Sequence, residues 1–398
     1  GLGPEGRRFK SCRPDHFMIN FLKPENKFNI KLQSPSKSLW TTFKKAFVSK
    51  KNFKSYWKKI NKDNLPKDLV LITEKFLETE SYDWVSKFWR HCMINHFKSI
   101  VDKTPEEALK SIILTDVTSH TYFEKKNFLN TNKKIKDEEV FKTNIFKKHD
   151  NLSSYESISY NTATLLYYNL KKKYTKLIYQ EINKEFYSQY SPNIEIDDLK
   201  INQHLMYTIN EIEKLQKIVD LKKKNLKILE IGAGYGRTAN SILSLCKEVK
   251  YVIADIPPTI FASMSNLKKY YPNLKISSAF DLGKNHDLNN FVDQNDVTFI
   301  FPHQLRQLNN KKFDLTLMIG VSLEMEPGDI KRYMSFINNL SKNLYMKVFE
   351  FSGLPFSFYK FYRHNVRSDY FIPESWEELF NEVGDETDFM YHLGYKIK

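Results

Sequence analysis

Cysteine is scarce in this chain. Only three cysteines occur among 398 residues, at Cys12, Cys92 and Cys246, and no two of them share a short spacing. An odd, unpaired set argues against a disulfide framework and against a cysteine-based zinc site. Histidine and aspartate also show no metal-ligand spacing such as His-x-x-x-His, so we expect no required metal.

Long apolar runs are also missing. No stretch approaches the roughly 18 uninterrupted apolar residues that span a bilayer. The first residues lack the basic-then-apolar pattern of a secretory signal, so a cytoplasmic location is expected by default. Residues 1–17 (GLGPEGRRFKSCRPDHF) show no periodicity, and Met18 begins a stretch of different character. We interpret residues 1–17 as an expression remnant or a misassigned start and exclude them from the fold.

What the chain does have is an excess of positive charge. The formal net charge is +15, and such an excess is typical of proteins that bind phosphate groups. Residues 1–200 hold 37 Lys and Arg against 24 Asp and Glu, a net of +13, whereas residues 201–398 hold 25 against 23, a net of +2. Because the second half is nearly neutral, a nucleic-acid partner is disfavoured.

Residues 18–200 are expected to form a mainly α-helical N-terminal domain. In residues 38–60, Trp40, Phe43 and Phe47 recur at helical spacing between lysines. Such a basic amphipathic helix either packs its aromatic side chains into its own domain or lies on an anionic membrane surface, and we favour the first. A second helix is expected to begin at Thr104, because a capping hydroxyl, a proline and two acids follow one another there.

Residues 201–398 alternate between short β-rich runs and helical stretches. This alternation predicts an α/β domain with a parallel sheet and helices on both of its faces. The gap between the second and third runs is long and is expected to hold an insertion. The expected strands are 227–231, 250–256, 297–301, 313–319 and 344–349.

A glycine-rich turn carries the clearest chemical signal. In ILEIGAGYGRT (Ile228–Thr238) an apolar strand ends at Glu230 and Ile231 and leads into three glycines with the spacing G-x-G-x-G. Dinucleotide-binding proteins instead carry G-x-G-x-x-G. Asp255 ends the next strand, where a carboxylate can accept hydrogen bonds from both hydroxyls of a ribose. Two acids beside such a turn fit a nucleoside that carries an amino-acid tail.

These motifs resemble those of class I S-adenosylmethionine (SAM) dependent methyltransferases. More narrowly, the chain resembles the bacterial putative sugar O-methyltransferase family. The resemblance covers roughly Asn202 to the C-terminus, with the helical front half similar only in general character, and it implies a Rossmann-like methyltransferase sheet with SAM as the cofactor. The segments that carry it are IGAGYGR (Ile231–Arg237), DIPPT (Asp255–Thr259), FPHQL (Phe301–Leu305) and FDLTLMIGVSLEM (Phe313–Met325).

The resemblance also implies which residues bind the cofactor. The glycine turn lies at the methionine end of SAM, Asp255 at the ribose, Pro302 and His303 at the adenine, and the segment after the fourth strand faces the methyl group. The implied cofactor-binding residues are Glu230, Ile231, Gly232, Ala233, Gly234, Tyr235, Gly236, Asp255, Ile256, Pro302, His303, Ile319 and Gly320.

A sugar hydroxyl is a poor nucleophile, so its methylation should need a general base. The candidates, in order, are Glu324, His303 and His364. The expected acceptor is a sugar or glycan, for example on a nucleotide- or lipid-linked precursor of a surface polysaccharide. The basic front half suits an anionic, phosphorylated precursor of this kind or peripheral contact with the inner membrane. Two alternatives stay open: an RNA methyltransferase, favoured by the basic first half but lacking an acceptor motif, and a non-catalytic SAM-binding module.

Overall fold

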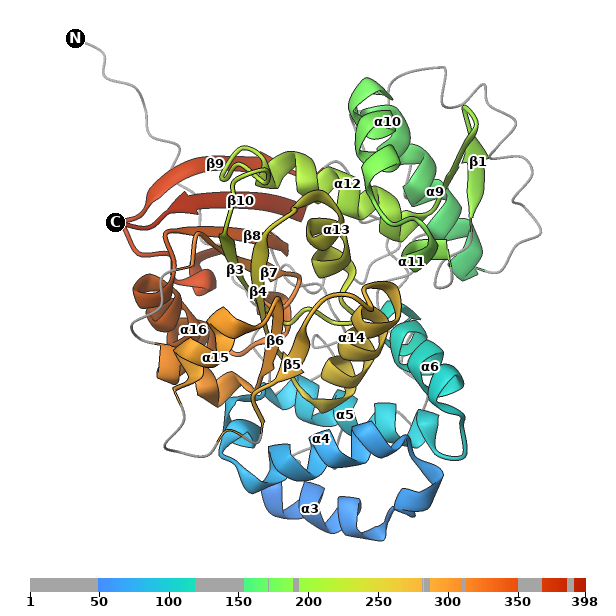
Figure 1. Ribbon diagram of the computed structural model, residues 1–398, viewed down its shortest axis with the longest axis vertical. Helices are drawn as coiled ribbons and strands as arrows, with labels where there is room; N and C mark the ends of the chain where they lie inside the picture. Colours follow the sequence, from blue (N-terminus) through green and yellow to red (C-terminus); the bar gives the residue numbers. More distant parts are fainter. Residues whose placement is uncertain are drawn as a thin grey trace, which may run out of the picture.

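The structure is a computed structural model of the chain (Figure 1). It describes residues 49–118, 154–170, 172–188, 193–280, 282, 287–308, 313–349, 367–384 and 390–398. Several features singled out in the sequence lie outside these ranges: residues 1–17, the aromatic residues Trp40, Phe43 and Phe47, and the candidate base His364.

An eight-stranded sheet forms the centre of the second half. Its strand order is β5-β6-β4-β3-β7-β8-β10-β9; the first six strands pair in parallel, and β10 pairs antiparallel with both β8 and β9. The strands are β3 (Leu226–Ile231), β4 (Val249–Ala254), β5 (Ile276–Ser278), β6 (Val297–Ile300), β7 (Leu315–Ile319), β8 (Asn343–Phe349), β9 (Glu377–Val383) and β10 (Met390–Lys396).

Helices cover both faces of this sheet. On one face Leu226 and Ile228 of β3 join a buried cluster with α12, α13 and α14; on the other, Leu229 and Ile231 join a second cluster with α15 and α16. Figure 1 shows α13 and α14 on one side of the strands and α15 and α16 on the other. The expected α/β class is therefore confirmed. The helices are α12 (Gln203–Leu215), α13 (Arg237–Leu245), α14 (Pro257–Tyr270), α15 (Leu288–Gln294) and α16 (Pro327–Leu340).

The front half supplies two groups of helices. One group, α3 to α6, packs through α4, α5 and α6 against α14; the other, α9 to α11, packs through α9 and α10 against α12 (Figure 1). Buried side chains from both groups belong to the same cluster as one face of the sheet. The expected domain division at residue 200 stays a prediction. The helices are α3 (Lys50–Lys59), α4 (Lys67–Glu78), α5 (Lys87–Ile100), α6 (Pro105–Thr118), α9 (Ser154–Asn169), α10 (Lys172–Glu181) and α11 (Glu185–Ser188).

Two of the expected helices can be compared with the structure in detail. Helix α6 begins as expected: Thr104 Oγ1 accepts from the Glu107 N–H (3.3 Å), and the Glu107 carboxylate accepts from the Thr104 N–H (2.9 Å). This reciprocal pair is a capping box. Within residues 38–60 the described helix is α3, whose Phe53 and Trp57 are buried in the first cluster while Lys54 between them is exposed. No helix in the described ranges is long and apolar enough to cross a bilayer.

Some strands were not expected. The long gap before β6 holds β5 and α15, and β9 and β10 extend the sheet beyond β8. In the front half, β1 (Ile194–Ile196) and β2 (Leu199–Ile201) form an antiparallel hairpin between α11 and α12. These segments are short or carry charged residues, so they lack the continuous apolar pattern of the parallel strands.

Candidate functional site

The backbone turns through three left-handed residues after β3. Gly232, Gly234 and Gly236 have φ angles of 75°, 60° and 87°. Residues with a Cβ rarely adopt these values, so the spacing of the three glycines is a requirement of the backbone. Gly236 is the N-cap of α13, so the turn presents the helix N-terminus with its unpaired N–H groups and partial positive charge. We call residues 232–236 the glycine loop.

The surroundings of these glycines differ. A Cβ on Gly232 would lie 2.5 Å from Val321 Cγ2, so the loop there touches the segment after β7. Among the described residues other than the chain neighbours, no atom lies within 4 Å of the corresponding position on Gly234, or on Gly320, which has a φ of 73° and follows β7. Because β3 and β7 are neighbouring parallel strands, both open positions lie at the carboxyl edge of the sheet. This is the edge at which α/β sheets bind ligands.

Asp255 ties the glycine loop to the end of β4. Its Oδ2 accepts a hydrogen bond from the Gly234 N–H (3.0 Å), and its Oδ1 accepts from the Ile256 N–H (2.8 Å) and the Thr259 hydroxyl (2.6 Å). The side chain is 7% exposed. These contacts fix the orientation of the carboxylate, which the sequence predicts to bind a ribose.

Glu230 lies on β3 below the loop and is only 2% exposed. Its Oε2 accepts a hydrogen bond from the Tyr251 hydroxyl at 2.8 Å. Burial raises the pKa of Glu230 to about 7, although the Tyr251 hydrogen bond and the charge of Arg237 act in the opposite direction. Glu230 therefore exchanges its proton near neutral pH, which an exposed glutamate does not.

A buried ion cluster (Glu211, Arg237 and Lys347) supports the loop from the α12 side. Arg237, the first residue of α13, donates from Nη2 to Glu211 Oε1 (2.9 Å) and from Nη1 to the Thr208 hydroxyl (2.8 Å). Lys347 of β8 donates to the same Glu211 oxygen at 3.0 Å. Burial opposes ionisation of Glu211, but the charges and hydrogen bonds of both cations outweigh it and lower its pKa. The cluster joins α12, α13 and β8 at the base of the site.

Several predicted cofactor residues turn their side chains into the protein. Tyr235 stacks on Phe186 at a centroid distance of 5.7 Å, and its hydroxyl is hydrogen-bonded to His204 Nδ1. Burial, followed by the charge of Arg237, lowers the pKa of His204 to about 3, so this histidine is neutral at physiological pH. The side chains of Ile231, Ala233 and Ile256 are buried in the two clusters. The side chains of these four residues are therefore buried, and their backbone atoms are what they can offer to a ligand at the edge of the sheet.

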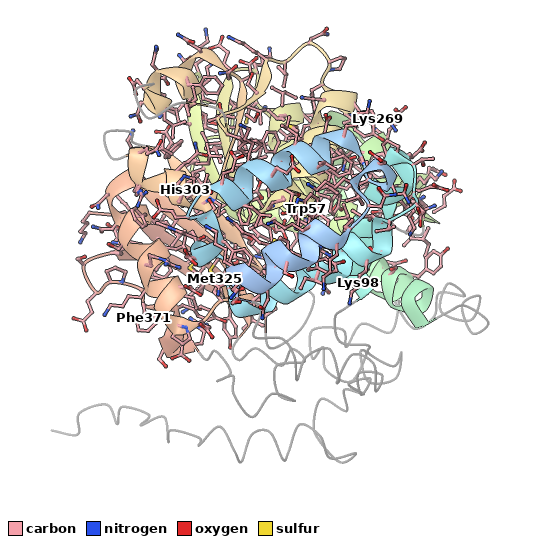
Figure 2. All side chains as sticks on the ribbon, turned by 90° about the horizontal axis from the view of Figure 1, so that it is seen from below. Trp57, Lys98, Lys269, His303, Met325 and Phe371 are labelled. Atoms are coloured by element: carbon pink, nitrogen blue, oxygen red, sulfur yellow. The ribbon has the colours of Figure 1, made fainter. Side chains whose placement is uncertain are left out.

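His303 and Pro302 lie in the short helix η4 (Pro302–Leu308) that follows β6. His303 Nδ1 is hydrogen-bonded to the Ser81 hydroxyl, which belongs to η2 (Ser81–Trp84) in the N-terminal segment. Burial, and then the charge of Lys50, lowers the pKa of His303 to about 4, so its ring is neutral at pH 7. In Figure 2 the N-terminal helices cover the side of the molecule where His303 is labelled.

Glu324 is the last residue of η5 (Ser322–Glu324), just after Ile319 and Gly320 at the end of β7. Its Oε2 accepts a hydrogen bond from the indole N–H of Trp89, at 2.5 Å. Glu324 is 9% exposed, as is His303. Two of the three candidate bases thus lie at the carboxyl edge of the sheet in contact with N-terminal residues, whereas the third, His364, lies outside the described residues.

The sequence did not point to the residues that hold this site together. Thr259 and Asn266 of α14 bind Asp255 and the Tyr235 carbonyl, the latter at 3.1 Å. Ser81 and Trp89 bind the two candidate bases from positions more than 200 residues earlier in the chain. No local pattern marks such long-range partners. Among the described residues, no group of three His, Cys, Asp or Glu side chains could hold a metal ion.

Comparison with known proteins gives matches at the level of structure only. No protein-family model and no curated protein sequence matches the chain. Among 181 matching solved chains, a Pyrococcus horikoshii protein is 14% identical, with 57% of this chain and 100% of that chain covered and a TM-score of 0.35. Magnesium protoporphyrin IX methyltransferase from Synechocystis with bound S-adenosylhomocysteine (SAH) is 11% identical (56% and 100% covered, TM-score 0.35). The fibrillarin pre-rRNA processing protein of Methanococcus jannaschii is also 11% identical (54% and 85% covered, TM-score 0.33). At these identities and scores the function has to be argued from the site itself.

Proposed function

We propose that the protein binds SAM at the glycine loop and is a SAM-dependent methyltransferase. The observation that carries this proposal is the hydrogen bond from the Gly234 N–H to Asp255 Oδ2 (3.0 Å). It places a left-handed glycine turn, a helix N-terminus and a fixed carboxylate together at the carboxyl ends of two adjacent parallel strands, β3 and β4. Such an arrangement suits a nucleoside with an amino-acid tail.

The residues present fit this cofactor. The open positions at Gly234 and Gly320 allow a ligand to approach the backbone where any side chain would project. Asp255 directly follows β4, at the position where a carboxylate can accept hydrogen bonds from ribose hydroxyls, and Glu230 offers a buried carboxylate for an ammonium group. When bound, SAM supplies an activated methyl group on a sulfonium centre.

The finer proposal is O-methylation of a sugar hydroxyl. The protein has to hold that hydroxyl in line with the methyl group, exclude water and accept a proton. We assign the role of proton acceptor to Glu324, which follows β7 close to Gly320 in the chain and is almost fully buried. His303 is neutral and suited to hydrogen-bond an acceptor rather than to carry a charge. The net charge of +13 over residues 1–200 supports a phosphorylated acceptor such as a nucleotide- or lipid-linked sugar.

Calorimetric titration with SAM and SAH tests cofactor binding. The informative variant is Gly234→Val, because a branched side chain at a φ of 60° strains the loop and fills the open position. Gly328→Val is its matched control: Gly328 also has open space around it but has no left-handed backbone and lies in α16. We expect both ligands to bind the wild type and the control, with affinity reduced at least about tenfold in Gly234→Val. A folded wild-type protein that binds neither ligand would contradict the proposal.

A transfer assay with labelled SAM tests the acceptor class. Nucleotide sugars, polysaccharide fragments and bulk RNA are offered separately, with Glu324→Gln as the catalytic control. Turnover on a sugar, lost in Glu324→Gln, is the expected result. Methylation of RNA, with binding weakened by salt, would replace the sugar proposal by a nucleic-acid substrate. SAM binding without turnover on any acceptor would favour a non-catalytic module.

A further inference from the structure

One stretch of the N-terminal segment crosses the edge of the sheet, and we call residues 81–90 the crossing segment. Tyr82 and Val85 are buried in the first cluster, whereas Trp84 is buried in the second, beside Tyr333 and Phe336 of α16. Among the described residues before α12, Trp84 is the one whose side chain is buried in that second cluster. The segment is therefore anchored on both faces of the sheet, and between its anchors it passes the carboxyl ends of the strands.

The crossing segment is held rigidly. The Tyr333 hydroxyl donates to the Trp84 carbonyl (3.4 Å), and Arg90 Nε donates to the Val85 carbonyl (3.0 Å). The Arg332 guanidinium lies 4.7 Å from the centre of the Trp84 ring. Anchors on both sides keep the side chains of this segment in fixed positions relative to the sheet edge.

From this segment Trp89 reaches Glu324. An indole N–H can only donate a hydrogen bond, and it donates here at 2.5 Å to Glu324 Oε2. Trp89 thus holds Glu324 in one orientation.

The crossing segment also contacts His303, the second candidate base. Ser81, at its start, is hydrogen-bonded to His303 Nδ1. Because the His303 ring is neutral at pH 7, it places no positive charge beside the reacting groups. Both site residues, at the ends of β6 and β7, therefore contact the crossing segment.

We propose that Trp89 is a positioning residue for the reaction, which fixes the orientation of Glu324 through its indole N–H. This inference rests on the proposed function, since it assigns Trp89 an effect on the base of that reaction. The N-terminal segment is accordingly part of the catalytic site through this contact. Loss of the indole N–H should lower the rate of transfer and leave cofactor binding intact.

Nuclear magnetic resonance of the full chain with isotope-labelled tryptophan tests the contact. The chain has five tryptophans, and Trp89→Phe identifies the Trp89 signal. Replacement of the charged partner in Glu324→Gln should shift the Trp89 indole N–H signal. Trp376, whose indole N–H donates to the uncharged Asn338 Oδ1 at 2.9 Å, is the internal control and should not move. A Trp89 signal that Glu324→Gln leaves unchanged would overturn the proposal.

Rate measurements test the role. Trp89→Phe keeps an aromatic ring and removes the N–H, and Trp376→Phe makes the same change at the control site. On the sugar acceptor found in the transfer assay, we expect kcat of Trp89→Phe to fall at least about tenfold, with SAM affinity within about twofold of wild type.

Other outcomes count against the proposal. A kcat of Trp89→Phe within about twofold of wild type, or an equal loss in Trp376→Phe, would show that Trp89 has no specific role. If the wild-type protein binds no SAM, the proposed function fails and the positioning role falls with it. The resonance experiment distinguishes the two failures, because the contact between Trp89 and Glu324 is then observed or absent independently of cofactor.

Discussion

The backbone N–H of Gly234 donates to the Asp255 carboxylate across the carboxyl edge of the sheet, with N and Oδ2 separated by 3.0 Å. The bond joins two chain segments 21 residues apart. The backbone at Gly234 is left-handed, and the carboxylate also accepts hydrogen bonds from the Ile256 N–H and the Thr259 hydroxyl at the start of α14. Loop and carboxylate are therefore one unit, and a change in either should affect cofactor binding.

Asp255→Ala should remove the contact between the glycine loop and the end of β4. The variant loses three accepted hydrogen bonds and leaves the Gly234 and Ile256 N–H groups without their acceptor. We expect SAM affinity to fall at least about thirtyfold and the free energy of unfolding to fall by about 1–3 kcal/mol. Calorimetry and urea unfolding measure the two effects.

Asp296→Ala is the matched control for this variant. Asp296 also accepts two hydrogen bonds, from the Lys275 N–H (2.9 Å) and from Lys250 Nζ (3.2 Å), but it precedes β6 at the opposite edge of the sheet. The Asp296→Ala variant should have a lower free energy of unfolding and an unchanged affinity for SAM. Equal losses of affinity in both aspartate variants would indicate a general effect of destabilisation rather than a binding role.

A second prediction concerns the buried ion cluster. Glu211→Gln leaves Arg237 and Lys347 in the protein interior without a negative charge. Removing one member of a buried ion group costs about 3–5 kcal/mol of unfolding free energy, because the remaining charges stay desolvated. Urea unfolding measures this cost.

Glu74→Gln provides the comparison for Glu211→Gln. Glu74 pairs with Lys62 at the surface, where its side chain is 42% exposed. An exposed pair contributes only about 0–1 kcal/mol. If the two variants lost similar stability, the ion cluster would not have the structural role that its burial implies.

The fold was largely predictable from local patterns. Apolar runs located all of the parallel strands except β5, and the Thr104 to Glu107 pattern placed the start of α6 within one residue. Both signals act within a few residues: burial on both faces requires a continuous apolar strand, and a capping box joins residues three positions apart. Strand β9 escaped prediction because it lies at the sheet edge, where its side chains are mostly exposed and several are charged.

The site was predictable only in part. The glycine loop was predictable because its left-handed backbone requires glycine, as the positive φ angles of its three glycines show. Asp255 was predictable because it lies directly at the end of the strand that follows this loop. The hydrogen-bond partners of the candidate bases could not be predicted in this way. Ser81 lies 222 residues from His303, and Trp89 lies 235 residues from Glu324. Such pairs depend on how the crossing segment packs over the sheet, and no periodicity or spacing encodes that packing.

A third prediction concerns Glu230 and the pH dependence of stability. Burial raises its pKa from 4.5 to about 7 in the folded protein. The folded chain therefore binds more protons than the unfolded chain between these values, and stability falls as the pH rises through this window. Relative to Glu230→Gln, the wild type should lose about 3 kcal/mol between about pH 4 and pH 8. Urea unfolding at several pH values measures the difference.

Tyr251→Phe serves as a companion variant. It removes the hydrogen bond that favours the ionised form of Glu230, so the pH window of this stability loss should move upward. A stability difference between the wild type and Glu230→Gln that does not change with pH would show that the carboxyl group has no raised pKa.

The last prediction links the same carboxyl group to the cofactor. If the ammonium group of SAM binds beside Glu230, its charge lowers the pKa of the carboxyl group, and binding must release a proton. At about pH 6.5 Glu230 is mostly protonated while the cofactor amine is already charged, so release should exceed about half a proton per SAM bound. Calorimetry in two buffers with different ionisation enthalpies counts this proton, because the apparent binding enthalpy then differs between buffers. Glu230→Gln has no proton to release and should give equal enthalpies. Equal enthalpies in the wild type as well would place the ammonium group away from Glu230 and leave the glycine loop and Asp255 as the main cofactor contacts.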